Sequence, residues 1–281
     1  MSCEDVVLNE EFSCRGIIDS HAHYFDRRFE AEVEGGAEAI LQNEVFGKGI
    51  SAVINVGTNP ENSIRCIEQA KRYEKMYAAV GIHPEDCQHL EGSAREELDK
   101  IRQLLDTPEK RAKNKIVAIG EIGYDYYWQP VDKARQTEFF EGQLKMAREF
   151  SLPIIIHDRE AHGDCFETVL KYPDVIGVFH SFSGSAEMAR ELTKRGFYIS
   201  FSGVLTFKNA RKVKEVAAVV PHDRILIETD CPYLAPHPYR GHINNSSYMV
   251  YTAKTLSEIL GLDFEATVEL TANNAKKLFG I

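Results

Sequence analysis

Apolar residues recur along the chain in short, nearly continuous runs. Eight such runs are spread over the whole sequence, at residues 16–23, 51–58, 77–84, 116–123, 153–158, 177–184, 197–203 and 225–230. Continuous rather than alternating apolar runs are typical of strands that are buried on both faces of a parallel sheet. The pattern therefore predicts eight parallel strands.

Amphipathic stretches fill most of the gaps between these runs. Helical spacing of apolar residues predicts helices over 61–75, 95–106, 132–150, 166–173, 185–196 and 211–220, and two closing helices over 246–260 and 263–279. Eight strands that alternate with helices favour an α/β fold of the (β/α)8 (TIM) barrel type. A doubly wound sheet usually has fewer strands and a phosphate-binding loop, and no G-x-G-x-x-G spacing follows the first strand here. We predict one barrel domain over 16–281, preceded by an acidic extension over 1–15.

Composition narrows the classes of protein further. Lys and Arg total 33 against 43 Asp and Glu, so the net charge of −10 provides no global basic field for a polyanion. The six cysteines form no C-x-x-C pair, which argues against a disulfide framework or a structural zinc site. The acidic N-terminus does not resemble a secretory signal, and no apolar run approaches the length of about 18 residues that a membrane span needs. We expect a soluble, cytoplasmic protein without a membrane partner, and a monomer by default.

Metal-ligand residue types stand at the ends of the predicted strands, where barrel enzymes carry their active sites. They are His21, His23, His83, Glu121, His157, His180, Glu228 and Asp230. Residues i and i+2 of a strand share a face, so His21 with His23, and Glu228 with Asp230, can each point to one place. One H-x-H pair among 10 histidines is weak evidence, but the joint pattern would bring many unpaired polar groups together unless cations satisfied them. Four imidazoles and two carboxylates exceed the three protein ligands of a typical catalytic zinc, so the count predicts two metals that share a bridging carboxylate.

The same residues carry a family resemblance. The motifs DSHAHYF (19–25), GIHPE (81–85), IGEIGYDYY (119–127), IIIHDREA (154–161), FHSFSG (179–184), IETDCPYLAPHPYRG (227–241) and TANNAKKLFG (271–280) closely resemble the TatD family of metal-dependent deoxyribonucleases, within the amidohydrolase superfamily. The resemblance runs from about residue 16 to the C-terminus. It implies one metal on His21, His23 and Asp230, Glu121 as the bridging carboxylate, and a second metal on His157 and His180. The fourth strand, IVAIGEIG, offers no lysine that could be carboxylated, which favours a TatD site over a dihydroorotase or phosphotriesterase site.

A two-metal mechanism follows from this set. Two divalent ions, whether Zn, Mg or Mn, can activate a water, hold a phosphodiester oxygen and stabilise the charge that develops. Asp230 is the candidate general base, and Glu121 is the catalytic bridging carboxylate. Two interpretations of Glu228 stay open: it orients a water or binds a third ion, or it hydrogen-bonds a metal-binding histidine. His83 is a candidate for a similar accessory role.

Candidate substrate contacts lie in the segments that follow the strands. Arg159 and Arg240 are candidates for binding phosphate, whereas Lys208 is more simply a solvated charge. Aromatic side chains after the fourth and eighth strands could stack on bases, namely Tyr124, Tyr126, Tyr127, Trp128 and Tyr233. The basic run at 109–115 precedes the fourth strand, so we expect a solvated loop at the opposite end of the barrel.

The main hypothesis is a two-metal deoxyribonuclease of 3′-5′ exonuclease type that acts on single-stranded DNA or strand ends. An alternative keeps the metal site but assigns it a small-molecule amide or ester, or an aminoacyl ester on transfer RNA. A third hypothesis, a barrel that binds metal or nucleic acid without catalysis, predicts loss of the water-activating group, yet Asp230 and Glu121 are both present. Arg159, Arg240 and the aromatic cluster favour a phosphate-bearing polymer over the alternatives.

Overall fold

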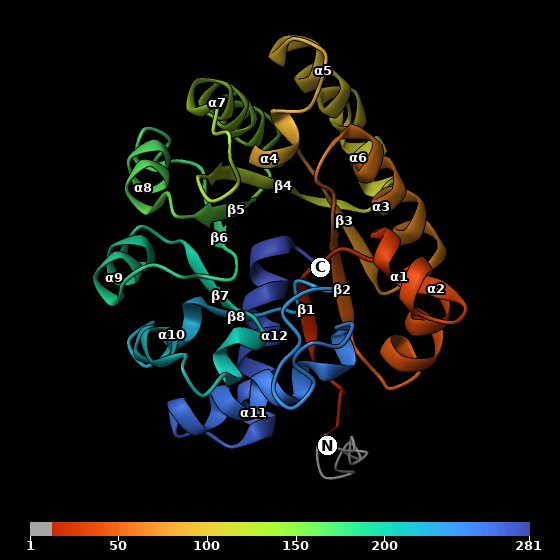
Figure 1. Cartoon of the computed structure of the whole chain (residues 1–281), viewed down its shortest axis with the longest axis vertical. Helices are drawn as coiled ribbons and strands as arrows, with labels where there is room; N and C mark the ends of the chain where they lie inside the picture. The colour runs from red at the N-terminus through yellow and green to blue at the C-terminus, as the bar shows by residue number, and fades with distance from the viewer. Residues whose placement is uncertain (1–12) are drawn as a thin grey trace.

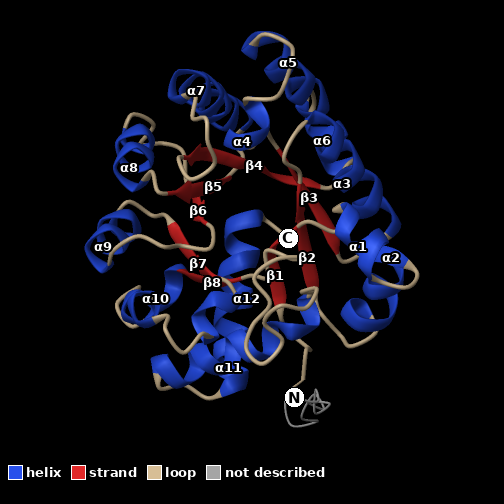
Figure 2. Cartoon of the chain, viewed as in Figure 1, coloured by secondary structure: helices blue, strands red, loops and turns tan. Residues whose placement is uncertain are grey.

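The computed structural model describes residues 13–281, and within them eight parallel strands form one ring. Most of the acidic extension predicted over 1–15, with Cys3, lies outside the described residues. The strands pair in chain order: β1 Ile18–Ala22, β2 Ala52–Val56, β3 Met76–Val80, β4 Ile116–Asp125, β5 Ile154–Arg159, β6 Gly177–Phe179, β7 Tyr198–Phe201 and β8 Ile225–Ile227. Figures 1 and 2 show the ring of strands surrounded by helices. This architecture confirms the predicted (β/α)8 barrel.

The ring closes between β1 and the segment that directly follows β8. Ala22 forms an isolated parallel bridge with Cys231. The backbone N–H of His23 donates to the carbonyl of Cys231 at 2.9 Å, and the N–H of Asp230 donates to the carbonyl of His21 at 2.9 Å. The seam of the barrel therefore holds three of the predicted ligands, His21, His23 and Asp230, side by side.

The helices between the strands agree with the predicted pattern and add several short ones. The predicted helices correspond to α3 Pro60–Arg72, α5 Ala94–Leu105, α7 Lys133–Phe150, α8 His162–Leu170, α9 Ala186–Lys194, α10 Arg211–Ala217, α11 Met249–Leu260 and α12 Phe264–Phe279. The others are α1 Arg27–Glu32, α2 Gly36–Ala39, α4 Pro84–Cys87 and α6 Pro108–Lys113, with a π-helical segment at Ile40–Phe46 and 3-10 turns at Gly203–Thr206 (η2), His222–Arg224 and Ser246–Tyr248. Elements of three to seven residues span too few turns for an apolar period to show in the sequence.

The basic run at 109–115 is not the solvated loop that the sequence predicted. Thr107 caps α6 by accepting from the N–H of Lys110, and Pro108 occupies the first turn, where its missing N–H costs nothing. Lys115 follows the helix, and its ammonium group donates to the carbonyls of Ala70, Tyr73 and Glu74 at 3.1, 2.7 and 2.7 Å. These carbonyls belong to the last turn of α3 and the residues after it, so Lys115 satisfies groups that the helix leaves unpaired.

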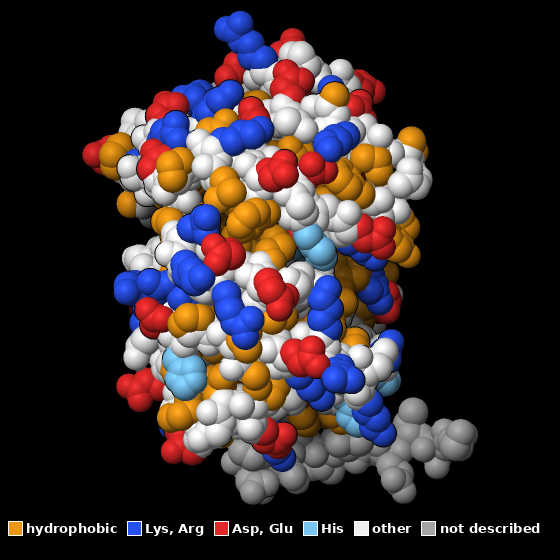
Figure 3. Space-filling model, turned by 90° about the vertical axis from the view of Figure 1, so that its left-hand side faces the viewer, with side chains coloured by type: hydrophobic (Ala, Val, Ile, Leu, Met, Phe, Trp, Pro, Cys, Tyr) orange, Lys and Arg blue, Asp and Glu red, His pale blue; other side chains and the backbone are white. Residues whose placement is uncertain are grey.

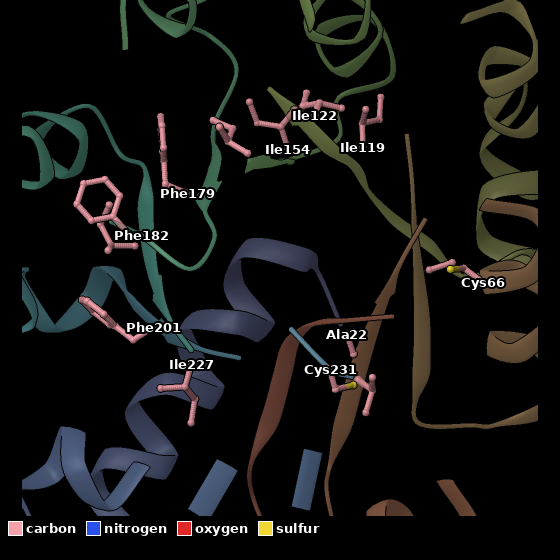
Figure 4. Close-up of a cluster of buried hydrophobic side chains, with 14 of the residues drawn as sticks. Ala22, Cys66, Ile119, Ile122, Ile154, Phe179, Phe182, Phe201, Ile227 and Cys231 are labelled. Atoms are coloured by element: carbon pink, nitrogen blue, oxygen red, sulfur yellow. The ribbon is translucent and has the colours of Figure 1, made fainter. Parts of the chain in front are cut away.

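Two apolar layers hold the barrel together. The inner layer fills the ring with Ile18, Ile54, Ala118, Ile155 and Leu226 and is closed at the N-terminal end of the strands by Ala272, Ala275 and Phe279 of α12. The outer layer lies between the strands and the surrounding helices. Figure 4 shows part of it, with Ile119 and Ile122 from β4, Phe179 from β6 and Phe201 from β7. Because both faces of the strands are buried, the continuous apolar runs of the sequence have a direct structural cause.

The described residues bear on two predictions made from composition, which concern disulfides and membrane spans. The five cysteines between residues 13 and 281 are all free and buried. In the same part of the chain, every helix is too short or too polar to span a bilayer.

Candidate metal centre and active-site cavity

Glu121, near the middle of β4, is the centre of a cluster of imidazoles. Its Oε2 lies 3.3 Å from His21 Nε2 and 3.6 Å from His23 Nε2. Its Oε1 lies 2.6 Å from both His157 Nδ1 and His180 Nε2. The two oxygens of one carboxylate thus face two separate pairs of histidine nitrogens.

The group on the Oε2 side comes from the seam of the barrel. His21 Nε2 and His23 Nε2 are 3.0 Å apart, and Asp230 Oδ1 lies 3.6 Å and 3.3 Å from them. Four atoms that surround one ion tetrahedrally at about 2.1 Å are separated by about 3.4 Å. The observed separations of 3.0–3.6 Å in this group are therefore those of ligands around a shared ion.

The group on the Oε1 side comes from β5 and from the ends of β3 and β6, on either side of β4. His157 Nδ1 and His180 Nε2 are 3.3 Å apart, and His83 Nε2 lies 3.7 Å from Glu121 Oε1. His83 accepts the N–H of Glu85 at its Nδ1 atom and so caps α4. The histidine that begins a short helix is therefore also placed beside the proposed bridging carboxylate.

The outer nitrogens of three of these histidines have defined partners. His23 Nδ1 lies 2.7 Å from the carbonyl of Val56, His157 Nε2 lies 2.9 Å from Asp125 Oδ2, and His180 Nδ1 lies 3.2 Å from Glu228 Oε1. A carbonyl or carboxylate only accepts, so each of these outer nitrogens carries a proton, and the inner nitrogen is the one that can bind a cation. Hydrogen bonds of this kind orient metal-binding histidines and raise their basicity.

The inner nitrogens of His157 and His180 face Glu121 Oε1 across 2.6 Å, a contact that either a proton on the imidazole or a shared cation stabilises. Glu228 also points to a bound cation, because its Oε2 is buried and has no hydrogen-bond partner among the described residues. Burial opposes ionisation of Glu121, but the imidazoles of His180, His21, His83 and His157 hold its pKa well below the ordinary value. The donor set fits divalent metal ions: His and Glu side chains converge within 4.8 Å in sets such as His21–His23–Glu121 and His83–Glu121–His157.

A network behind the cluster fixes the seam. Asp19 is fully buried and accepts from the N–H and the hydroxyl of Thr229 at 3.0 and 2.7 Å, from the Ser246 hydroxyl at 2.6 Å and from the N–H of His21 at 3.2 Å. Burial raises the pKa of the Asp19 carboxyl and the hydrogen bonds offset part of that rise, so the pKa is about 6. Asp19 therefore connects β1 by hydrogen bonds to Thr229, the residue before Asp230.

The cluster forms the floor of a cavity of about 830 Å³ at the C-terminal ends of the strands. His23, His83, Glu121, His157, His180 and Asp230 all line it. Asp230 has the more accessible carboxylate, with 17% of its side chain exposed against 4% for Glu121. Such a cavity is large enough for a ligand of nucleotide size.

Three of the predicted substrate contacts lie at this cavity. Arg159, Trp128 and Tyr233 line it, and the side chain of Trp128 is about half exposed. The guanidinium carbon of Arg159 is 3.8 Å from the ring centre of Tyr127 and 5.5 Å from that of Trp128. Tyr233 donates its hydroxyl to Asp26 at 2.7 Å. Arg159 and the two aromatic residues beside it therefore form one assembly at the mouth.

Two predicted contacts do not line the cavity, and one of them, Tyr124, is wrong as a substrate contact because it is buried. Tyr124 is buried, and its hydroxyl lies 3.0 Å from Thr137 and 3.2 Å from Thr168, because it points from β4 into the helix layer. Arg240 is exposed but is not among the residues that line the cavity, and its guanidinium carbon lies 4.5 Å from the ring centre of Phe207. Lys208, expected to be a solvated charge, is exposed and also absent from the cavity wall.

Asp125 is a site residue in contact with a predicted metal ligand that the sequence reasoning missed. It lines the cavity, hydrogen-bonds His157 and accepts the N–H groups of Tyr127 and Trp128 at 2.8 and 3.2 Å. Alternation from Glu121 through Gly123 to Asp125 puts it on the same face of a strand that continues past residue 123. That spacing could have identified it. Glu228 hydrogen-bonds His180 through Oε1, as the second interpretation expects, while its unpartnered Oε2 and its place beside His21 and His180 keep the third-ion interpretation open.

The chain is similar to known proteins along most of its length. The family model of TatD related DNase matches residues 18–280. The chain is 41% identical over 268 residues to the uncharacterized metal-dependent hydrolase YabD of Bacillus subtilis (strain 168), covering 94% of this chain and 99% of that protein. The crystal structure of YjjV, a TatD homolog from Escherichia coli K12, superposes with a TM-score of 0.85 at 29% identity, covering 95% of this chain and 99% of the other.

A more distant neighbour shares the fold alone. The phosphotriesterase homology protein from Escherichia coli superposes with a TM-score of 0.63 at 14% identity, over 95% of this chain and all of the other. The match of the family model over nearly the whole described barrel, together with the identity to YabD, shows that the chain belongs to the TatD family.

Proposed function

We propose that this chain is a two-metal phosphodiesterase that acts on the ends of DNA strands. The observation that carries the proposal is the position of Glu121, whose two oxygens face two separate pairs of histidine nitrogens. His21, His23 and Asp230 would hold one divalent ion with Glu121, and His157 and His180 would hold the other with Glu121. When bound, such ions supply Lewis-acid activation of a water and of the scissile phosphate.

Asp230 is the proposed general base. Its carboxylate is the more accessible of the two in the cluster and lines the cavity, so it can contact a water beside a bound phosphate. From there it can take the proton of that water and pass it to the leaving oxygen. Glu121, nearly closed to solvent, serves instead to hold both groups of histidines at a fixed separation.

Arg159 and Trp128 provide the support for a nucleic-acid substrate. A guanidinium that rests on aromatic rings at the mouth is preorganised to bind a phosphate, and an exposed indole beside it can stack on a base. On the face in Figure 3, acidic and basic side chains are interspersed without a large area of one sign. This face therefore offers no basic surface for binding along a duplex, which supports local capture at the cavity.

The charge of the rim supports a second candidate function. Asp26, Glu85, Asp86 and Asp158 line the same cavity as Arg159, so carboxylates outnumber cations there. This balance disfavours a long polyanion and suits a neutral ester or amide, including an aminoacyl ester. The same base and ligands serve attack on a carbonyl carbon.

Turnover assays separate these functions. Single-stranded DNA, RNA, a small phosphodiester and a carboxylic ester are incubated with the protein as purified, after chelation, and after addition of Zn, Mn or Mg. We expect hydrolysis of single-stranded DNA that a chelator abolishes and a divalent ion restores. Activity on the carboxylic ester alone would favour the second candidate, and activity on neither phosphodiester nor DNA would refute the first.

A further inference from the structure

The wall of the cavity differs sharply between its two sides. The ends of β1 to β5 contribute charged groups, among them Glu85, Asp86, Asp158 and Arg159. Apart from His180 and Asp230 of the metal-ligand cluster, the segments after β6, β7 and β8 contribute side chains without charge. We call this side the apolar lobe and define it by Phe182, Ser183, Ser202, Val204, Val213 and Leu234.

Contacts between three loops build the apolar lobe. Ser202, after β7, lies 2.9 Å from Ser181, after β6, through their hydroxyl oxygens. The loop after β8 packs directly on η2, because a Cβ atom at Gly203 would come within 2.1 Å of the carbonyl oxygen of Leu234. The N–H of His237 also donates to the Thr206 hydroxyl at 2.8 Å. The lobe is therefore a preformed surface that needs little ordering when a ligand binds.

The side chains of the lobe leave apolar surface uncovered. Three of these side chains are only half-buried although they line the cavity, namely those of Val204, Val213 and Leu234. The side chain of Phe182 is buried. Apolar surface of this kind gains free energy when an apolar group covers it. A phosphate would lose hydration there without a cation to replace it.

The place of the apolar lobe beside the metal-ligand cluster determines which part of a substrate it can contact. Ser181 directly follows His180, and its N–H donates to Glu228 at 2.7 Å, so the lobe begins beside the metal-ligand cluster. If the scissile phosphate lies at that cluster, as the proposed function requires, the nucleoside attached to it is the next group along. Of its parts, the base has the flat apolar faces and polar edge that match apolar walls with hydroxyls.

We propose that the apolar lobe is a nucleobase subsite for the nucleotide at the scissile phosphate. The proposal rests on the phosphodiesterase function above and deepens it. Serine hydroxyls both donate and accept, so the lobe presents no fixed hydrogen-bond pattern. It should accept purines and pyrimidines alike, and the enzyme should discriminate little by sequence.

The test uses two substrates that differ only in the base and sugar. Thymidine 5′-(p-nitrophenyl phosphate) and methyl p-nitrophenyl phosphate share the leaving group and the phosphate. Val213→Phe fills the lobe from α10, and the ratio of kcat/KM for the nucleoside ester to that for the methyl ester should fall about tenfold, about 1.4 kcal/mol. The matched control is Val219→Phe, since Val219 is half-buried just after α10 and is not part of the cavity wall. It should leave the ratio unchanged.

Calorimetric titration with thymidine, which has no phosphate, tests the lobe independently of catalysis. The wild-type protein should bind thymidine and Val213→Phe should bind it at least about tenfold more weakly, with circular dichroism showing that both are folded. An unchanged ratio in Val213→Phe, or no thymidine binding by the wild-type protein, would overturn the subsite. If thymidine binding is lost in Val213→Phe while neither ester is hydrolysed by the wild-type protein, the subsite stands and the phosphodiesterase proposal fails.

Discussion

The two ends of the barrel are formed by the same strands and are chemically opposite. At the C-terminal ends, imidazoles and carboxylates converge around Glu121 beneath an open cavity. At the N-terminal ends, Ile18, Ala118 and Leu226 pack against Ala272 and Phe279 of α12, and apolar side chains fill the ring. The comparison indicates that the closed end contributes stability while the open end keeps polar groups whose burial costs stability, as in other barrels of this type. If so, substitutions at the two ends should have separable effects.

Glu121→Gln should give the largest effect, because it acts on both groups of ligands at once. An amide has one acceptor oxygen and no charge, so it cannot face two cations as a carboxylate does. We expect kcat to fall by about 10³-fold or more, equivalent to several kcal/mol. Bound metal, measured by elemental analysis, should fall with it while circular dichroism shows a folded protein.

The matched control for that variant is Glu138→Gln, which changes an exposed glutamate on α7. It should retain wild-type turnover and metal content. Wild-type metal content and turnover in Glu121→Gln would contradict the central role of this carboxylate.

Phe279→Ala should give the next largest effect, at the opposite end. Phe279 is 5% exposed and helps close the ring, so its truncation leaves a cavity where α12 packs on the strands. We expect the free energy of unfolding to fall by about 3 kcal/mol, measured by urea denaturation. Metal content, and turnover at temperatures where the variant is folded, should match the wild-type protein.

Ile64→Ala is the control for Phe279→Ala, because Ile64 is an apolar residue of α3 with 46% of its surface exposed. It should change the free energy of unfolding by less than about 0.5 kcal/mol. Loss of metal from Phe279→Ala without loss of stability would show that the two ends are coupled, and the separation drawn above would fail.

The barrel and the convergence of His, Glu and Asp side chains at one end of it were predictable for one physical reason. Strands buried on both faces must be continuously apolar, so a His or Glu that ends such a run stands out, as His157 does after three isoleucines. Position along a strand then converts directly into position in space, because all strands of a parallel barrel end at the same side. Glu121 and His180 became predictable in this way.

Features that depend on local irregularity or on loop paths were not predictable. The regular register of β1 is interrupted between Asp19 and Ala22. There the hydroxyl oxygen of Ser20 lies 3.2 Å from that of Ser200 on β7, while the ring of the next residue, His21, stacks on that of His180 with the ring centres 4.0 Å apart. Strict alternation would have turned one of these two outward. The position of Arg240 was not predictable for a related reason, since it depends on the path of the loop after β8, which brings the guanidinium carbon of Arg240 to 4.5 Å from the ring centre of Phe207.

Asp125→Asn should give the smallest of the three effects and shows most sharply how the open end works. Asp125 contacts His157 from the side away from Glu121, at 2.9 Å, so it orients a ligand and is itself a positioning residue. Asn can accept a hydrogen bond from the imidazole but carries no charge to hold the proton on His157 Nε2. We expect metal affinity to fall about 10- to 100-fold.

Measurement at two metal concentrations separates positioning from catalysis in Asp125→Asn. At limiting metal, turnover should fall with the affinity, whereas at saturating metal most of kcat should return because Asp230 and Glu121 are intact. Asp99→Asn, on the exposed surface of α5, should change neither quantity. A kcat that stays low at saturating metal would show that Asp125 acts on the reacting groups themselves. The open end would then depend on more than the cluster around Glu121, because the charged wall of the cavity that includes Asp125 would take part in the chemistry.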